Sequence, residues 1–348
     1  MRRSLMKAAV AGAVLLPLPV TAHAAENDVR PVSLPFLWPR AELDDVAADG
    51  AGGVWVGGGQ GAYCVPWIDY CALYSAGNPV VRRWTGSSWR EYPINGWTGN
   101  GLIGRVASGA GRTWIGGDAT DSGYFRYLAV FDGSSFQRVE SPSAASVGML
   151  STGPAGTWIT QAVGPDSAEP RLLRRDGDAW RAFDVPGHDA FISDVQGLAP
   201  DDAWAVGARR GEDGTGWRPA VARFDGAAWT WTTPPDLGSE YPGITKVVPV
   251  GPDDVWVMAA GGLAHWDGSG WTVIDGPGRI ADLAVDGTGT PWVVTAYYDG
   301  GTLHRYSGGT WQPVALPAGT RLNDIAVTGT STIWGVGRAD DAPVVVSN

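Results

Sequence analysis

The chain has 348 residues, of which 44% are hydrophobic, and its 36 acidic against 25 basic side chains give a formal net charge of −11. No run of basic residues interrupts this acidic balance, so phosphate backbones and anionic membrane surfaces would repel the chain. We therefore expect no nucleic-acid partner and no membrane insertion.

The first 24 residues have the pattern of an export signal. Arg2, Arg3 and Lys7 precede an apolar run from Ala8 to Val20, and small residues at Ala22 and Ala24 suit a cleavage site. The run is shorter than the roughly 20 residues needed to span a bilayer. We predict a signal peptide over residues 1–24, exported by the general or the twin-arginine route, and a secreted, extracellular mature chain.

Cys64 and Cys71 are the only two cysteines, and they lie in one short segment. An even pair in an exported chain predicts a disulfide bond, whereas a metal site would need further ligands and this segment holds no histidine. Closing so small a ring stabilises the folded state by on the order of 2–3 kcal/mol, because it lowers the entropy of the unfolded chain.

A tryptophan that follows a short turn and opens an apolar strand recurs seven times along the chain. The seven are Trp55, Trp114, Trp158, Trp204, Trp256, Trp292 and Trp334. Their spacing matches the roughly 40–50 residue period of four-stranded propeller blades. Each repeat therefore predicts one blade with strands A to D, the tryptophan opening strand B.

The hairpin between strands C and D is the most regular part of the repeat. Its turns combine Asp, Ser or Thr with Gly, which supplies the positive φ of a tight turn. The aromatic residues opening strand D are Trp89, Phe136, Trp180, Trp229, Trp271 and Trp311. Only six such hairpins exist for seven tryptophans, so one outer strand is missing.

The N-terminal segment Pro31–Trp38 is the candidate for the missing strand. It stands directly before the strand A sequence Leu43-Asp-Asp-Val46. In the same way the strand D segment Trp311–Pro317 stands before the strand A sequence Leu322-Asn-Asp-Ile325. A ring completed in this way leaves no exposed sheet edge between its last and first blades. We predict an all-β fold, one seven-bladed β-propeller over residues 25–348, whose last blade is completed by an N-terminal strand.

With diglycines at Gly57-Gly58 and Gly116-Gly117 and an aromatic-(Asp/Ser/Thr)-Gly-x-x-Trp closing strands C and D, the chain resembles kelch and galactose-oxidase-type propellers. It also resembles regulator-type sensor propellers. The resemblance implies a fold and no activity. A galactose-oxidase copper site needs two histidines and two tyrosines together, whereas His188, His265 and His304 fall in three different blades, and the sialidase Asp-box is absent.

The third position of strand A carries a charged residue in six of the seven repeats. These residues are Asp45, Arg105, Asp194, Lys246, Asp282 and Asp324, with Met149 in the remaining repeat. Strand A lines the channel of a propeller, so we expect a ring of charges near the channel mouth. The carboxylates would either bind Ca²⁺ or a cationic group, or cap neighbouring backbone N–H groups.

Aromatic residues outside the packing pattern concentrate in the B–C and D–A segments, which open on one face of a propeller. That face is the predicted ligand-binding surface, through aromatic rings and a cation. Its candidate residues are Trp67, Trp97, Trp217, Tyr124, Tyr297, Tyr298 and Arg209.

These features favour a secreted, non-catalytic propeller that binds a carbohydrate or an extracellular protein through its loops, acts as a monomer and needs no cofactor. One alternative is a polysaccharide hydrolase or lyase that uses paired carboxylates of the same face. The other is a structural scaffold associated with the cell wall.

Overall fold

The computed structural model describes residues 29–119, 127–140, 142, 147–161, 171–186, 190–211, 214, 216–237, 243–296 and 301–348. Throughout these ranges the elements are β-strands, arranged in seven four-stranded antiparallel sheets and one two-stranded hairpin. They include no helix able to cross a membrane. The predicted signal peptide and the candidates Tyr124, Tyr297 and Tyr298 lie outside the described residues.

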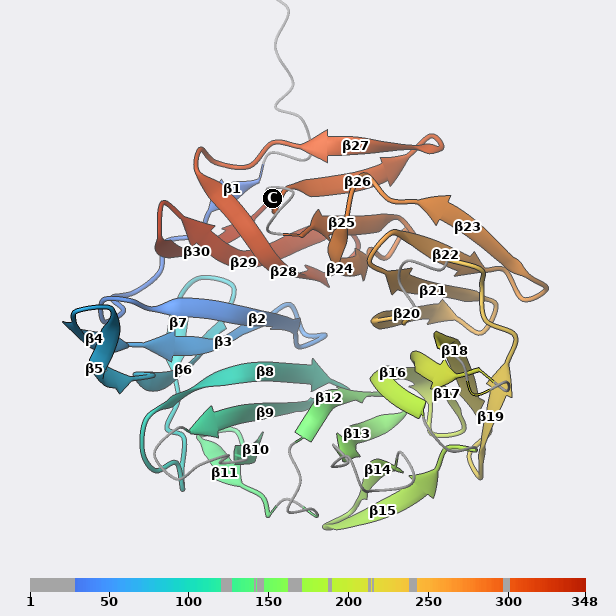
Figure 1. The fold of residues 1–348 in the computed structure, drawn as a ribbon, viewed down its shortest axis with the longest axis horizontal. Coiled ribbons are helices and arrows are strands. Elements are labelled where there is room, and N and C mark those ends of the chain that lie inside the picture. The colour runs from blue at the N-terminus through green and yellow to red at the C-terminus, as the bar shows by residue number, and fades with distance from the viewer. Residues whose placement is uncertain are drawn as a thin grey trace, which may run out of the picture.

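The seven sheets are arranged as blades around a central axis, so the fold is an all-β, seven-bladed propeller (Figure 1). The innermost strands are β2 (Glu42–Ala48), β8 (Gly101–Gly109), β12 (Val147–Gly153), β16 (Ala190–Ala199), β20 (Lys246–Gly251), β24 (Ile280–Val285) and β28 (Thr320–Thr328). The second strands are β3 (Val54–Gln60), β9 (Arg112–Ala119), β13 (Gly156–Gln161), β17 (Asp202–Arg210), β21 (Asp254–Ala259), β25 (Pro291–Thr295) and β29 (Thr332–Ala339).

The outer half of each blade is the predicted C–D hairpin. The third strands are β6 (Asn78–Trp84), β10 (Tyr127–Phe131), β14 (Arg171–Asp176), β18 (Trp217–Phe224), β22 (Gly262–Trp266), β26 (Leu303–Ser307) and β30 (Ala342–Ser347). The outermost strands are β7 (Trp89–Glu91), β11 (Phe136–Arg138), β15 (Ala179–Asp184), β19 (Trp229–Thr232), β23 (Trp271–Asp275), β27 (Thr310–Val314) and β1 (Arg30–Pro31). The eighth sheet is a hairpin of β4 (Tyr63–Trp67) and β5 (Tyr70–Ser75), inserted between β3 and β6.

The recurring tryptophans hold neighbouring blades together. All seven are buried, and each packs against the outer hairpin of the following blade. Trp158, for example, lies 5.4 Å from the ring centroids of both Phe224 and Trp229 in the next blade. Burying aromatic rings of this size dominates core energetics. The tryptophan of strand B and the aromatic residue that opens strand D therefore recur together, because they pack against each other between neighbouring blades.

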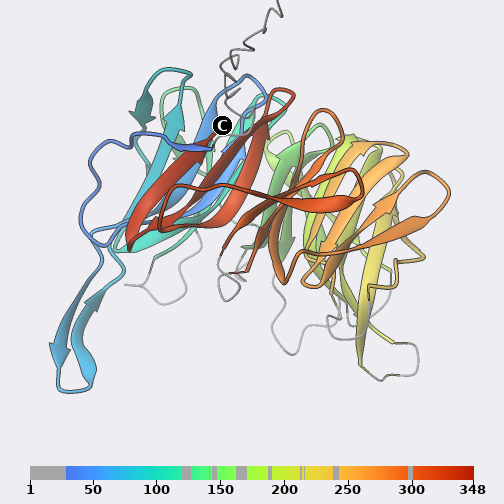
Figure 2. The same cartoon turned by 90° about the horizontal axis from the view of Figure 1, so that it is seen from above.

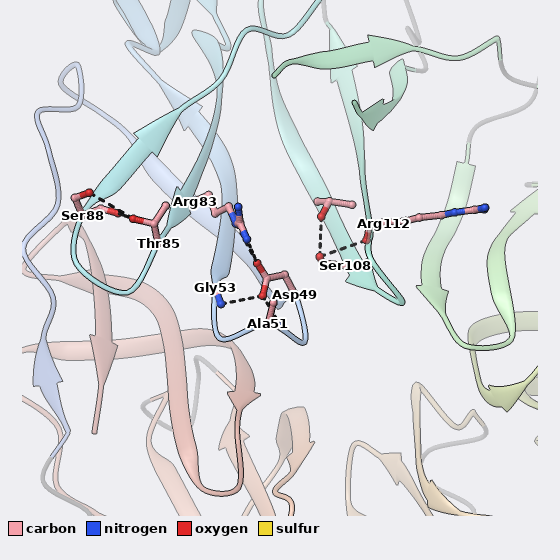
Figure 3. A network of polar contacts seen from close by, with 9 residues as sticks. Asp49, Ala51, Gly53, Arg83, Thr85, Ser88, Ser108 and Arg112 are labelled. Carbon is pink, nitrogen blue, oxygen red and sulfur yellow. Dashed lines mark hydrogen bonds and ion pairs between the residues drawn. The ribbon is translucent and has the colours of Figure 1, made fainter. Parts of the chain in front are cut away.

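A cation on the third strand stacks over the tryptophan of its own blade. Arg83 lies opposite Trp55 in the sheet, and its guanidinium carbon is 5.5 Å from the indole centroid. The Asp49 carboxylate of the preceding turn orients Arg83 by accepting a hydrogen bond from its Nε at 3.0 Å. It also accepts hydrogen bonds from the backbone N–H groups of Ala51 and Gly53 (Figure 3). This turn chemistry fixes the end of the first blade opposite the hairpin insertion.

The N-terminal segment supplies the outer strand of the last blade, but its extent differs from the predicted one. Arg30 and Pro31 pair with Ser347 and Val346 of β30, and the Val32 N–H donates to the Val345 carbonyl at 2.8 Å. The strand therefore begins one residue before Pro31 and ends well before Trp38. The alignment with Trp311–Pro317 was wrong for residues 33–38, which leave the sheet and run along the first blade.

Candidate functional site

The innermost strands line a central channel of about 740 Å³. All six predicted ring residues line it: Asp45, Arg105, Asp194, Lys246, Asp282 and Asp324. In β2 the lining runs from Asp44 at one end to Ala48 at the A–B turn, so the ring occupies the end nearer the D–A connections. The residues at the third position of each innermost strand therefore form one layer of the channel wall.

Four of the ring carboxylates cap the next blade. The Asp45 carboxylate accepts the backbone N–H of Val106 at 2.8 Å, and Asp282 accepts that of Ile325 at 2.9 Å. Asp194 and Asp324 make the same bond to the blade that follows each of them, at 3.0 and 2.8 Å. A β-bulge precedes each of these four aspartates. Because a bulge re-aims the side chain that follows it, the four carboxylates reach across a blade junction.

Lys246 supplies a cation inside this ring. Its ammonium pairs with Asp282 and lies 3.9 Å from an oxygen of Asp324, with 29% of the side chain exposed to the channel. Lys246 thus balances part of the charge of Asp282 and Asp324, and each of the four carboxylates accepts a backbone N–H group. No cluster of three or more potential metal ligands occurs among the described residues. The bonds to backbone N–H groups match the predicted capping alternative, and a Ca²⁺ ion in this layer would compete with the Lys246 ammonium for Asp282 and Asp324.

Burial governs the protonation of the ring. It raises the pKa of Asp324 to about 7, and the neighbouring Asp45 carboxyl adds to the rise while Lys246 opposes it. Burial also raises the pKa of Asp194 to about 6 and that of Asp282 well above its ordinary value. Although burial alone would lower the pKa of an amine, the Asp282 and Asp324 carboxylates raise that of Lys246. These shifts follow from the structural use of the ring.

A different region concentrates the exposed apolar side chains. Eight of the twelve strongly exposed large hydrophobic residues of the described part lie in the β4–β5 hairpin and the segment beside its base. We call this set the hairpin surface: Phe36, Trp38, Tyr63, Val65, Trp67, Ile68, Tyr70 and Tyr74. Figure 2 shows the hairpin extending well beyond the blades. Large apolar side chains are rarely exposed together in soluble proteins, so this surface is a candidate interaction site.

The hairpin is stabilised along its length by local features. A disulfide bond joins Cys64 to Cys71 across the two strands, as predicted. At the neck Gly77 has a φ of +84°, and a Cβ there would lie 2.3 Å from the Gln60 carbonyl oxygen. Only glycine fits where the two arms come this close. The Gly77 carbonyl also accepts the N–H of Gly101, which ties the neck to the second blade.

The tip of the hairpin places an apolar residue in a strained conformation. Ile68 follows Trp67 in the two-residue turn, has a φ of +55° and is 86% exposed. Left-handed backbone is unfavourable for a β-branched residue, and hairpin turns at such positions favour glycine. An exposed isoleucine in this position gains nothing from packing, so the fold itself does not account for the strained backbone.

The N-terminal segment is anchored so that its aromatic residues face outward. Buried Arg82 of β6 donates to the carbonyls of Pro35 and Phe36 at 3.2 and 3.0 Å. The Trp38 N–H donates to Gln60 Oε1 at 3.1 Å, directly before the hairpin begins. Phe36 and Trp38 contact each other edge to face at 5.7 Å. These bonds join the two parts of the hairpin surface at its base.

The predicted loop residues have different surroundings. Trp67 lies in the hairpin surface. Trp217 on β18 is exposed, and the guanidinium of Arg210 on β17 lies over its ring. Trp97 instead packs on Tyr127 at 4.9 Å and donates its indole N–H to the Gly99 carbonyl, so it belongs to the packing of the second blade. Arg209 lies over the Trp231 ring at 5.7 Å. The structure does not gather these four into one site.

Sequence reasoning missed several members of the hairpin surface. The sequence pattern places Phe36 in the predicted closing strand, and it places Val65, Ile68 and Tyr74 in a B–C loop, whereas the structure has a hairpin there. The alternation of larger and smaller residues from Tyr63 to Trp67 was the available signal for the first strand of a hairpin.

No family model matches the chain, and no curated protein matches it in sequence. Similar solved structures include YCF48 from Cyanidioschyzon merolae (16% identity, TM-score 0.56, 92% of this chain and 98% of that one). They also include virginiamycin B lyase from Staphylococcus aureus (14% identity, TM-score 0.63, 92% and 98%). The extracellular domain of a putative one-component system of B. thetaiotaomicron is a third (12% identity, TM-score 0.59, 92% and 40%). YCF48 is also known in a structure with a D1 peptide bound. At these identities the likeness shows the propeller fold alone.

Proposed function

We propose that this chain is an exported, non-catalytic β-propeller that binds a polypeptide partner through the hairpin surface. The observation that carries this proposal is the concentration of eight exposed apolar residues in one projecting element and the segment beside it. Trp67 and Tyr70 lie directly opposite each other in the hairpin and are 60% and 63% exposed. Large aromatic residues of this kind are the usual anchors of protein interfaces.

The composition around these residues favours a polypeptide over a sugar. From Gly61 to Gly77 the only charged residue is Asp69, and the segment Val32–Pro39 has none. A sugar site needs polar groups that hydrogen-bond the hydroxyls beside its stacking ring, whereas a protein interface has an apolar centre depleted of charge. A carbohydrate stacked on Trp67 and Tyr70 is the second candidate, because both rings lie on one face of the hairpin.

The geometry of the channel supports the non-catalytic part of the proposal. An acid–base pair of a hydrolase or lyase has to reach its substrate with oxygens that are free to act. Four ring carboxylates instead accept backbone N–H groups of neighbouring blades, and Asp282 also pairs with Lys246. Their positions are those of structural caps.

Two further observations support export and partner binding. The Cys64–Cys71 disulfide is typical of an oxidising compartment, in agreement with the export pattern of residues 1–24. Among proteins with the same fold, YCF48 has been captured with a D1 peptide, and the one-component-system domain is extracellular. We extend peptide binding and an extracellular location to this chain as proposals.

The test compares binding by the mature chain, residues 25–348, with binding by two variants. Trp67→Ser removes an anchor of the hairpin surface, and Trp217→Ser removes an exposed tryptophan of the fourth blade as a matched control. Immobilised proteins are exposed to an envelope and culture extract of the source cells and, separately, to a glycan array. A protein captured by wild type and by Trp217→Ser but lost with Trp67→Ser supports the proposal. Equal capture by all three overturns it, and binding to the glycan array alone assigns the surface to carbohydrate.

A further inference from the structure

The proposed function leaves open how a partner is recognised, and on that basis we infer that the partner adds a β-strand to the β5 edge of the hairpin. The partner contributes an extended polypeptide segment whose apolar side chains alternate. Its backbone pairs with Tyr70–Ser75, and its apolar side chains cover the aromatic face of the hairpin. This mode is β-augmentation, in which backbone hydrogen bonds give affinity and alternate side chains give specificity.

The first observation is that the hairpin has open edges. The β4–β5 sheet contains these two strands only, and among the described residues neither strand forms backbone hydrogen bonds with another blade. Unpaired N–H and C=O groups along an exposed apolar strand are a template for pairing with another chain. In the seven blades, by contrast, the outermost strands belong to four-stranded sheets that pack against their neighbours.

The second observation is that the two edges differ. Strand β4 contains Pro66, which has no backbone N–H and therefore interrupts any ladder formed on that side. Strand β5, Tyr70–Ser75, contains no proline and keeps a backbone N–H group at every residue, although its register with β4 shifts between Cys71 and Leu73. An added strand on β5 therefore meets no missing donor, whereas one on β4 meets Pro66.

The third observation is the order of side chains across the hairpin. Successive side chains of a strand point to opposite faces, so Tyr63, Val65 and Trp67 share one face, and Tyr70 joins them as the cross-strand neighbour of Trp67. The Cys64–Cys71 disulfide and Tyr74 lie on the other face. One face is thus a strip of exposed apolar side chains, and the other is held by a covalent bond.

Charge defines the chemistry of the partner segment. The hairpin carries one acidic residue, Asp69 at its tip, in a chain with 36 acidic and 25 basic residues. A segment with an uncharged, alternating centre pairs there without leaving a charge buried, and a basic residue at one end would lie near Asp69. The disulfide also lowers the entropic cost of ordering the hairpin when it binds, since the two strands are already joined.

The experiment uses a displayed library of random twelve-residue peptides selected on the immobilised mature chain. Enriched peptides are synthesised and titrated against wild type, Trp67→Ser and Trp217→Ser. Each peptide is then made in two forms, N-methylated on its odd or on its even central amides. Since N–H groups of a strand alternate between its two edges, only one form loses hydrogen bonds to β5.

We expect enriched sequences with alternating apolar residues that lose at least tenfold in affinity with Trp67→Ser and keep it with Trp217→Ser. One N-methylated form should bind at least tenfold more weakly than the other. Amide hydrogen exchange should slow at alternate residues of β5 on binding and stay unchanged in β4.

Equal binding by the two N-methylated forms, with the Trp67→Ser loss retained, would overturn strand addition while the proposed function stands. Peptides that bind wild type and Trp67→Ser alike would contradict both. Hairpin-dependent dimerisation of the free protein, or hairpin-dependent binding to phosphatidylcholine vesicles with no peptide enriched, would assign the edge to another occupant and overturn the inference.

Discussion

Asp324 in the seventh blade accepts the backbone N–H of Val46 in the first blade at 2.8 Å, across 278 positions of sequence. This bond joins the last innermost strand to the first one. The same contact recurs from Asp45 to Val106, from Asp194 to Val247 and from Asp282 to Ile325. The capping carboxylates therefore form one repeated device that links adjacent blades around the channel.

Replacing Asp324 tests this device. Asp324→Ala leaves the Val46 N–H without its partner, and a buried unsatisfied donor costs about 1–3 kcal/mol. Asp324→Asn keeps an acceptor oxygen and resembles the protonated carboxyl, so it should unfold close to wild type at neutral pH. The free energy of unfolding from urea titration separates the two variants. Equal destabilisation by Ala and Asn would show that the hydrogen bond is not the source.

Stability should fall as the pH rises from about 4 to about 7. The folded chain holds a proton on Asp324 up to a pKa of about 7, whereas the unfolded chain releases it near 3.8, so the folded state binds more protons in this window. The carboxyls of Asp45 and Asp282 and the Lys246 ammonium face Asp324 and influence its pKa, and Lys246 stays charged throughout this window. Urea midpoints at pH 5 and pH 8 should differ for wild type and differ less for Asp324→Asn. A wild-type midpoint that rises with pH would contradict this assignment.

Removing the N-terminal strand should destabilise the last blade. Deleting residues 25–32 removes the pairing with β30 and the buried Val29 side chain, whose burial alone is worth about 1.5–3 kcal/mol. Deleting residues 25–28, which precede Val29, is the control and should leave the melting temperature unchanged. Calorimetry of both forms measures the difference. If the two deletions melt alike, β1 contributes nothing to the blade.

Tryptophans of the two structural classes should respond differently to truncation. Trp204 is 2% exposed and packs against Trp266 and Trp271 of the next blade, so Trp204→Ala should cost about 3–5 kcal/mol of unfolding free energy. Trp217 is 43% exposed, and its replacement by alanine should cost far less. Chemical denaturation of the pair distinguishes a packing position from a surface position. Similar losses in both would contradict the assignment of Trp217 to the surface.

Ile68→Gly should separate binding from stability. Glycine relieves a left-handed conformation that costs an isoleucine roughly 1–2 kcal/mol, and the 86% exposed side chain contributes almost no packing. We expect an unchanged or higher melting temperature together with an affinity for the selected peptides lowered about tenfold. Differential scanning calorimetry and peptide titration provide the two values. A lower melting temperature with intact binding would make Ile68 a structural residue.

The blades were predictable because their signals are local. A tryptophan after a tight turn and a Gly-containing hairpin repeat at a fixed period, and the physical cause is the packing of Trp55, Trp158 and their equivalents against the next blade. The capping role of Asp45 and its equivalents followed from the same alignment. The bonds to backbone N–H groups match one of the two alternatives stated for them, and the Lys246 ammonium would compete with the cation of the other.

The candidate surface was harder to predict because it depends on contacts between distant segments. Trp67 lies in a B–C segment and Trp97 in a D–A connection, which open on the same face, yet Trp97 packs against the Tyr127 ring and Trp67 is exposed. Phe36 and Trp38 matched an outer-strand pattern, but Arg82 and Gln60 hold their backbone along the first blade instead. The bonds from the Arg82 guanidinium cannot be read from residue spacing.

The pairing of β1 with β30 also determines how the fold responds to mechanical tension. Arg30 lies opposite Ser347, so both ends of the described chain leave the last blade at the same point. A force applied between the termini would unzip the antiparallel pair one residue at a time rather than shear it. Once this pair has opened, the packing between the last and first blades has to resist the force. There the ring centroid of Trp334 lies 5.9 Å from that of Trp84 and 6.4 Å from that of Trp89.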